Sequence, residues 1–242
     1  MTEGQAPPPP PPPTEPPAQP PAQPPAQPPP PPPGYQPATP GAAGGSGYAV
    51  RADVARQEEY SRFMPLIKWL LLIPHYVCLA LLGVAAVVVI IISFFAVLFT
   101  RNYPRGMFDF VLGVQRWGWR VGAYLFLLTD EYPPFTLEDV PDYPARLTID
   151  YPEQGVDRWR PLLSWLLIYP FQLVTSILLF LAFFAVVAAF FTILFTKTFS
   201  EGMFRFVVNA LRWSARSTAY EYFMVTKYPP FEFEDTGDPT SV

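Results

Sequence analysis

Hydrophobic and polar residues occupy long separate blocks of this 242-residue chain, rather than alternating at short range. Two blocks, 66–100 and 161–196, are almost continuously apolar, and the stretches 69–100 and 161–196 contain no Lys, Arg, Asp or Glu. Both are far longer than the roughly 18 apolar residues that indicate a membrane-inserted segment. A core helix of a soluble protein would show a polar stripe, which neither block has. The pattern therefore predicts a mainly α-helical integral membrane protein.

Each apolar block is followed by a segment that is apolar and aromatic except along one stripe. In 105–128 the polar and small residues recur in steps of three and four, so they share one helix face, and 201–224 repeats the pattern. A narrow basic stripe flanked by aromatic rings is typical of a helix lying in the lipid headgroup layer. We therefore expect two amphipathic interfacial helices, with crossing helices whose stripe faces a bundle interior as the alternative. The basic residues of the stripes are Arg105, Arg116, Arg120, Arg205, Arg212 and Arg216.

Short segments with alternating apolar residues precede and follow these helices. Residues 48–54 and 143–149 predict an opening strand before each set of helices. The sequence Tyr-Pro-Pro-Phe occurs twice, before 136–139 and before 232–235, and proline favours extended geometry in the residue that precedes it. The pattern there predicts two closing strands. If both ends of each set lie on one side of the membrane, opening and closing strands can meet in one small sheet.

The blocks belong to a tandem duplication. A shift of 96 residues superimposes 60–139 on 156–235 without a gap, and 30 of the 80 paired residues are identical. Repeats of this length are whole modules rather than solenoid units. The sequence therefore predicts a first membrane module at 48–139 and a second at 140–235.

The composition of the N-terminal segment differs from that of the modules. Of the 34 prolines, 21 lie in residues 1–50, which contain no Lys or Arg. Such a segment favours polyproline II, a solvated helix that acts as a semi-stiff spacer. We expect residues 1–47 to form a disordered Pro-rich tail and 236–242 a short second tail. Pro-Pro-Gly-Tyr at 32–35 matches a ligand pattern for aromatic-groove domains, or is a coincidence within low-complexity sequence.

Charge and reactive side chains exclude several classes of function. Sixteen basic and 20 acidic side chains give a net charge of −4, without the clustered basic face that nucleic-acid binding needs. One cysteine, Cys78, and one histidine, His75, exclude a disulfide framework, a thiolate zinc site and most multi-histidine sites. A catalytic triad would need a third group beside them. The N-terminus also lacks the pattern of a cleavable signal peptide. We expect no enzyme activity, no catalytic residue, no cofactor and no metal.

The number of membrane crossings stays open. Basic residues flank both ends of both apolar blocks, as expected if an even number of crossings keeps them all on the cytoplasmic side. Each block would then be a helical hairpin, for which Pro74 and Gly83 are candidate bends in the first module and only Pro170 in the second. One long span per module is the alternative.

Several motifs recur together in the first module, and most have counterparts in the second. They are Leu72-Ile73-Pro74-His75, Leu98-Phe99-Thr100, Tyr103-Pro104-Arg105-Gly106, Phe108-Asp109-Phe110, Arg116-Trp117, Arg120, Leu127-Leu128-Thr129-Asp130 and Tyr132-Pro133-Pro134-Phe135. The combination resembles an uncharacterised bacterial family, the domain of unknown function numbered 4389. The second copy departs from it at Ile168-Tyr169-Pro170-Phe171 and Thr198-Phe199-Ser200-Glu201. The resemblance covers residues 48–235 and implies a membrane protein, without an established activity or active site.

Two functions from different classes fit these features. The first is a non-enzymatic scaffold or accessory subunit, multi-pass in the plasma membrane, whose cytoplasmic tail recruits a soluble protein partner. The second is a lipid-binding or transport component whose stripe arginines contact phosphate oxygens of anionic lipids. Anchoring and ion pairing along the helix are the alternative role of those arginines. A transporter would hide polar groups inside its spans, and their scarcity in 161–196 favours the scaffold.

Overall fold

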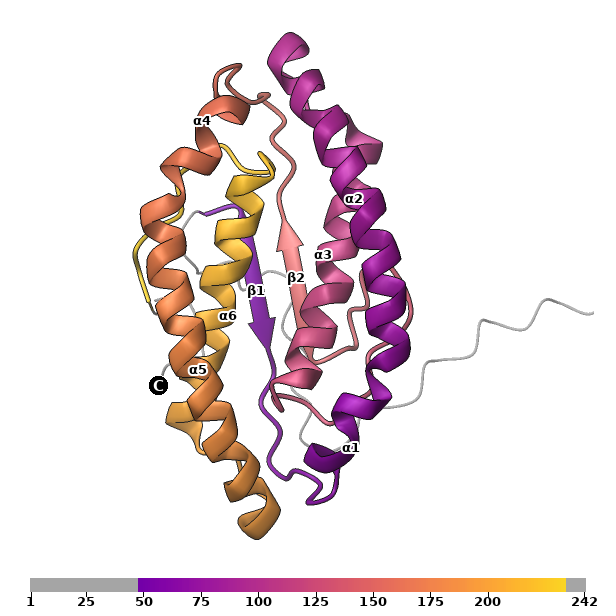
Figure 1. Cartoon of the computed structure of the whole chain (residues 1–242), viewed down its shortest axis with the longest axis vertical. Helices are drawn as coiled ribbons and strands as arrows, with labels where there is room; N and C mark the ends of the chain where they lie inside the picture. Colours follow the sequence, from indigo (N-terminus) through magenta and orange to yellow (C-terminus); the bar gives the residue numbers. More distant parts are fainter. Residues whose placement is uncertain (1–47, 234–242) are drawn as a thin grey trace, which may run out of the picture. The chain divides into compact units, whose positions relative to one another are not determined.

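The computed structural model describes residues 48–233, in which the two modules contain the same elements in the same order (Figure 1). The predicted tails and the Pro-Pro-Gly-Tyr sequence lie outside the described residues. Each helix of the second module begins and ends 96 residues after its counterpart, so the duplication holds for the backbone. The elements are β1 (Val50–Val54), α1 (Met64–Leu71), α2 (Ile73–Thr100) and α3 (Arg105–Leu125), followed by β2 (Ala145–Ile149), α4 (Arg160–Leu167), α5 (Tyr169–Thr196) and α6 (Glu201–Glu221).

Each apolar block folds as a short helix followed by a long one. The helices α2 and α5 each continue unbroken for 28 residues, so of the two alternatives the structure has one long helix per module and not a helical hairpin. The only break lies before Pro74 and Pro170, at the start of the long helices, where proline is tolerated because its missing N–H has no intrahelical acceptor. Gly83 is an ordinary position within α2. The segments Met64–Thr100 and Tyr169–Thr196 are long and apolar enough to cross a membrane.

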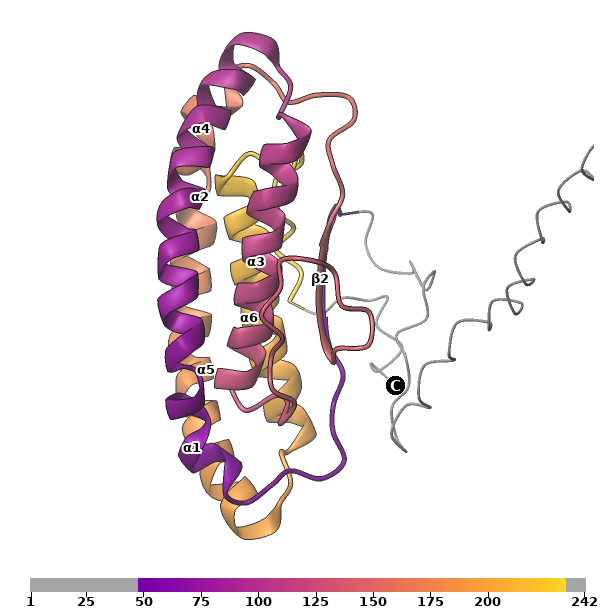
Figure 2. The ribbon, with the colours of Figure 1, turned by 90° about the vertical axis from the view of Figure 1, so that its right-hand side faces the viewer.

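The two predicted stripe-bearing segments are helical but end three residues early. After α3 and α6, Leu127 and Phe223 adopt positive φ angles of 61° and 58°, which stops the helix. Both helices lie in a middle layer between the long helices and the sheet (Figure 2). There α3 packs on α2 and β2, while α6 packs on α5 and β1. Protein thus covers both sides of these helices, whereas the sequence pattern suggested a stripe open to lipid headgroups.

The sheet consists of one strand from each module. β1 and β2 pair antiparallel, with Ala52 opposite Leu147 at the centre. The opening strands therefore pair with each other and not with closing strands. Residues 136–139 form no strand, contrary to the prediction, because Arg120 binds the carbonyl groups of Thr136 and Glu138 that a strand partner would have used. Residues 232 and 233, the described part of the second predicted closing strand, also lie outside any strand.

The strand pairing relates the two modules by an approximate two-fold rotation. Equivalent strands run in opposite directions, and so do the equivalent long helices α2 and α5 (Figure 1). The sheet has one buried face, to which Val50, Ala52 and Leu147 contribute, and this face packs on α3 and α6. Its other face is polar, and Arg51 and Asp150 form an exposed ion pair there at 2.6 Å.

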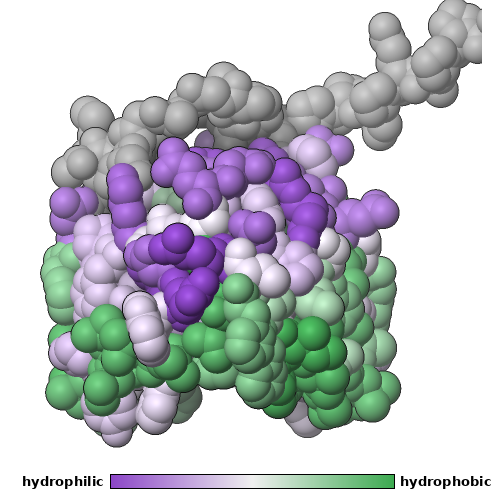
Figure 3. All heavy atoms as spheres, turned by 90° about the horizontal axis from the view of Figure 1, so that it is seen from above, coloured by the Kyte–Doolittle hydropathy of each residue, from purple (hydrophilic) through white to green (hydrophobic). Residues whose placement is uncertain are grey.

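Exposed hydrophobic residues are concentrated on the helices farthest from the sheet. Of the 38 large hydrophobic side chains that are exposed among the described residues, 33 lie within 63–99 or 159–195. We call the layer formed by α1, α2, α4 and α5 the apolar layer, and the sheet with its adjoining loops the polar layer. Seen along the helices, hydrophobic residues gather on one side and hydrophilic residues on the other (Figure 3). The apolar layer therefore suits apolar surroundings, and the polar layer suits water.

Candidate functional site

The stripe arginines of the first module bind backbone oxygens. Arg120 is 3% exposed and donates from Nη1 to the carbonyl oxygen of Glu138 at 3.0 Å and from Nη2 to that of Thr136. Arg116 donates from Nε to the carbonyl oxygen of Leu147, in β2, at 3.1 Å. Burial lowers the pKa of Arg120, but an arginine keeps its charge because its ordinary pKa exceeds 12. We call the Tyr-Pro-Pro-Phe sequence and the residues after it, 132–139 in the first module and 228–233 in the second, the closing segment. Arg120 and Arg116 tie α3 to the closing segment and to the sheet.

The stripe arginines of the second module also bind backbone oxygens, and one of them, Arg212, reaches into the first module. Arg212 donates from Nε to the carbonyl oxygen of Ala52 at 2.7 Å, and its Nη2 lies 2.7 Å from Oδ1 of Asp53. Both acceptors belong to β1 of the first module. Arg216 donates from Nη1 to the carbonyl oxygen of Glu232 at 3.4 Å. Charge-assisted hydrogen bonds of this kind stabilise the contact between α6 and β1.

Arg105 and Arg205, near the starts of α3 and α6, are the outward-facing members of the stripes. Their side chains are 57% and 37% exposed, and they pair with Glu153 and Glu201, each at 2.8 Å. The (i, i+4) pair is therefore formed in α6, whereas Arg105 binds a loop of the second module instead of Asp109. Each of the other four arginines donates to at least one backbone carbonyl. The structure thus directs four of the six stripe arginines to backbone carbonyl groups, two of them in the sheet and two in the segments that follow α3 and α6.

A buried ion pair that the sequence reasoning missed joins α1 to the loop after α3. Lys68 is 2% exposed, and its Nζ lies 2.7 Å from Oδ1 of Asp130 and 2.7 Å from the carbonyl oxygen of Thr129. The residues 96 positions later are Ser164 and Thr226. The available signal was a lysine inside the first apolar block where the second has a serine, but nothing local identifies a partner 62 residues away.

His75 lies in an aromatic cluster with Trp117, Tyr132 and Phe135. Its Nδ1 accepts a hydrogen bond from Nε1 of Trp117 at 2.9 Å, and its ring stacks on Phe135 with centroids 3.8 Å apart. At the equivalent place Phe171 stacks on Trp213 at 4.5 Å. The position therefore holds an imidazole ring in one module and a phenyl ring in the other, each packed between a tryptophan and a phenylalanine.

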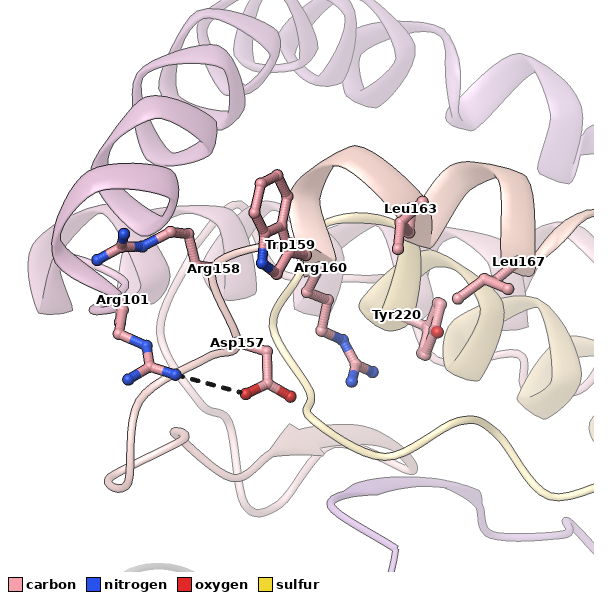
Figure 4. A pocket seen from close by; sticks show the side chains of 8 residues that line it. All are labelled: Arg101, Asp157, Arg158, Trp159, Arg160, Leu163, Leu167 and Tyr220. Atoms are coloured by element: carbon pink, nitrogen blue, oxygen red, sulfur yellow. Dashed lines mark ion pairs between the residues drawn. The ribbon is translucent and has the colours of Figure 1, made fainter.

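Two pockets lie at equivalent places in the two modules, each between the entry to a short helix and the residue that ends the long helix of the other module. The larger has a volume of about 610 Å³ and the smaller about 470 Å³. The larger is lined by Arg101, Asp157, Arg158, Trp159, Arg160, Leu163, Leu167 and Tyr220 (Figure 4). The smaller is lined by Glu59, Tyr60, Ser61, Arg62, Phe63, Asp130 and Lys197. We call them the basic pocket and the mixed pocket, since arginines predominate in the first and the second pairs two cations with two carboxylates.

Within residues 48–233, no group of three or more His, Cys, Asp or Glu side chains is placed to share a metal ion. The recurring polar contacts in this part of the chain are those of arginine side chains with carbonyl groups, carboxylates and aromatic rings.

A family model described as a domain of unknown function (DUF4389) matches residues 65–136 and 158–232. The two matched segments extend from the first short helix of each module to the segment after its last helix, so the duplication appears in the family match as well. No curated protein and no solved structure matches the chain.

Proposed function

The chain belongs to the family described as a domain of unknown function (DUF4389), and from this premise we propose that it is a non-enzymatic scaffold embedded in the plasma membrane by its apolar layer. In this proposal the polar layer faces the cytoplasm, and the N-terminal tail recruits a soluble protein partner there. The described part of the chain begins at Tyr48, directly before β1 in the polar layer. A tail joined to the chain at this point would lie on the cytoplasmic side in the proposed orientation.

The observation that carries the proposal is the one-sided distribution of exposed hydrophobic residues. The apolar layer exposes residues along the whole length of α2 and α5, from Ile73 to Phe99 and from Tyr169 to Phe195. A soluble monomer rarely exposes a contiguous apolar patch larger than a few hundred Å². Hydrocarbon chains of a bilayer cover such a surface without any specific partner.

The position of the polar layer favours helices that lie in the membrane plane over helices that cross it. The strands run alongside the middle of the long helices (Figures 1 and 2). If α2 and α5 crossed the bilayer, Arg51 and Arg146 on the sheet would lie near its midplane. Each such charge costs about 2.5–3.5 kcal/mol on insertion scales. In the in-plane arrangement the same residues face water.

Helix dimensions support the same arrangement. A 28-residue helix is about 42 Å long at 1.5 Å per residue, against a hydrocarbon core of about 30 Å. A layer one helix thick, about 10 Å, fits within one leaflet. Trp69 and Trp165, at equivalent positions of α1 and α4, are 60% and 62% exposed. Indole rings prefer the membrane interface, so these two residues would anchor the opposite ends of the layer.

Vesicle flotation tests the proposal. Leu81 and Ile177 are exposed at equivalent positions of α2 and α5, and we expect L81E/I177E to reduce the membrane-bound fraction after an alkaline wash at least about tenfold. The control, T148E/Q154E, adds the same charge to the polar layer and should float like the wild type. Circular dichroism checks that both variants are folded. Equal retention of L81E/I177E and wild type would overturn the proposal.

A further inference from the structure

The basic pocket has the chemistry of an anion site at the edge of the apolar layer. It combines three guanidinium groups, from Arg101, Arg158 and Arg160, with a single carboxylate, Asp157. In Figure 4 the side chains of Arg101 and Arg160 lie on either side of Asp157. The closest ion pair there, between Arg101 and Asp157, is 3.9 Å long, and the two side chains are 63% and 82% exposed. Such a pair neutralises little of the charge, so the pocket remains positive.

Arg160 is held in place, but two of its hydrogen-bond donor groups have no acceptor among the described residues. Its guanidinium lies 4.3 Å from the centroid of the Tyr220 ring, and its Nη1 donates to the carbonyl oxygen of Thr226. Its Nε and Nη2 are buried and have no hydrogen-bond partner among the residues that the structure describes. Burial also lowers the pKa of this side chain. An unpaired buried donor is costly, and because Arg160 lines the pocket, a small rotation of its guanidinium would bring these donors to an anionic oxygen there.

The remaining lining is apolar and continuous with the apolar layer. Trp159, Leu163 and Leu167 line the pocket and are themselves exposed large hydrophobic residues. A ligand that matches the whole lining has an anionic head beside the arginines and an apolar portion along α4. We propose that the basic pocket binds the phosphate of an anionic phospholipid, with the acyl chains lying against α4. This inference rests on the proposed membrane embedding and names the lipid class that the scaffold selects.

The mixed pocket provides an internal comparison. Arg62 is equivalent to Arg158, whereas Phe63 stands in place of Trp159 and Met64 in place of Arg160. It contains Glu59 and Asp130 beside Arg62 and Lys197, and Asp130 also pairs with Lys68. The same backbone geometry therefore presents three arginines with one exposed carboxylate in one place, and only one arginine and one lysine with two carboxylates in the other. Only the basic pocket should retain an anionic lipid.

The test uses the full-length protein reconstituted in phosphatidylcholine vesicles with and without phosphatidylglycerol, then extracted for native mass spectrometry. The wild type should retain phosphatidylglycerol in preference to phosphatidylcholine. R101Q/R158Q changes two exposed side chains and should lower that retention about fivefold for each arginine removed. R160M, which places the residue of the first module in the second, should lower it about fivefold. The matched control R62Q/K197Q should retain lipid like the wild type.

Other outcomes separate the sources of phosphate and the two proposals. If R101Q/R158Q retains phosphatidylglycerol like the wild type, or if the control loses it equally, the pocket is not the site. If inorganic phosphate displaces phosphatidylglycerol from the wild type, the ligand is a free anion and the lipid assignment is wrong. If the wild type does not associate with vesicles at all, the proposed membrane embedding fails as well.

Discussion

The two modules have the same backbone but different polar interiors, and the comparison separates what builds the fold from what is added to it. Their helices begin and end at equivalent residues. Inside that common frame the first module contains His75 and the Lys68–Asp130 pair, where the second has Phe171 and two hydroxyl residues. A frame that forms equally with both sets of residues does not depend on either. The polar groups of the first module are therefore additions to a packing arrangement that works without them.

The residues shared by both modules are mostly those that join the layers. Trp117 and Trp213 each contact the aromatic ring of the Tyr-Pro-Pro-Phe segment, at Phe135 and Phe231. The paired arginines bind the sheet or the closing segment in both modules. Contacts between the layers thus set the common backbone, and substitutions at positions where the modules differ test this conclusion.

The largest effect is expected for Lys68→Ala. Removing one partner of a buried ion pair leaves the other without compensation, which costs about 3–5 kcal/mol. Asp130 is 18% exposed, so the lower end, about 3 kcal/mol of unfolding free energy, is expected. Denaturant unfolding in detergent, followed by circular dichroism, measures the change.

Exchange of the whole pair is the informative control. The double variant K68S/D130T carries the residues of the second module and leaves no buried charge. We expect it to be more stable than Lys68→Ala. If K68S/D130T were the less stable of the two, the pair would be part of the frame and the comparison between modules would fail.

A smaller loss is expected for Gly113→Ala, where the modules also differ. A Cβ at Gly113 would lie 2.8 Å from Cβ and 2.9 Å from the carbonyl oxygen of Leu137, so the closing segment would have to move. Overpacking of this kind costs about 1–3 kcal/mol. Gly118 in the same helix has no such neighbour, and Gly118→Ala should be neutral or stabilise by up to about 1 kcal/mol. Equal effects of the two substitutions on unfolding would contradict the close packing of Leu137 on α3.

The smallest effect is expected for His75→Phe, which copies Phe171 into the first module. The stacked ring is kept, but the N–H of Trp117 loses its acceptor, and we expect a loss of about 1 kcal/mol, the lower end of the range for a buried donor left unpaired. His75→Ala removes the ring as well and should cost about 3 kcal/mol. Thermal unfolding of the two variants side by side measures the difference. Equal losses would show that the imidazole contributes more than a flat ring.

Much of the fold follows from local pattern. The 96-residue duplication, the apolar helices, the helices after them and the opening strands are all visible in the sequence because periodicity and composition are local properties. The partner of each face is not local. The period places Arg212 and Arg216 on one face of α6, but what covers Arg212 is β1, some 160 residues earlier. The interpretation of that stripe as open to headgroups could not anticipate a strand from the other module.

The helical hairpin was considered for a different reason, the distribution of basic residues. Basic residues at both ends of both apolar blocks suggested that both ends lie on one side of the membrane, and a crossing segment satisfies this only by turning back. A long helix in the membrane plane satisfies it without a turn. The charge pattern is therefore consistent with the proposed in-plane arrangement, and the turn was needed only because each apolar block was assumed to cross the membrane.

The orientation of the apolar layer is the central claim, and cysteine labelling tests it directly. Asn102 and Thr198 are exposed, 96 residues apart, and follow the ends of the antiparallel helices α2 and α5. In a Cys78→Ser background, Asn102→Cys and Thr198→Cys should both react with a membrane-impermeant maleimide from the same, cytoplasmic side. Labelling from opposite sides would show that the helices cross the bilayer and would contradict the in-plane arrangement.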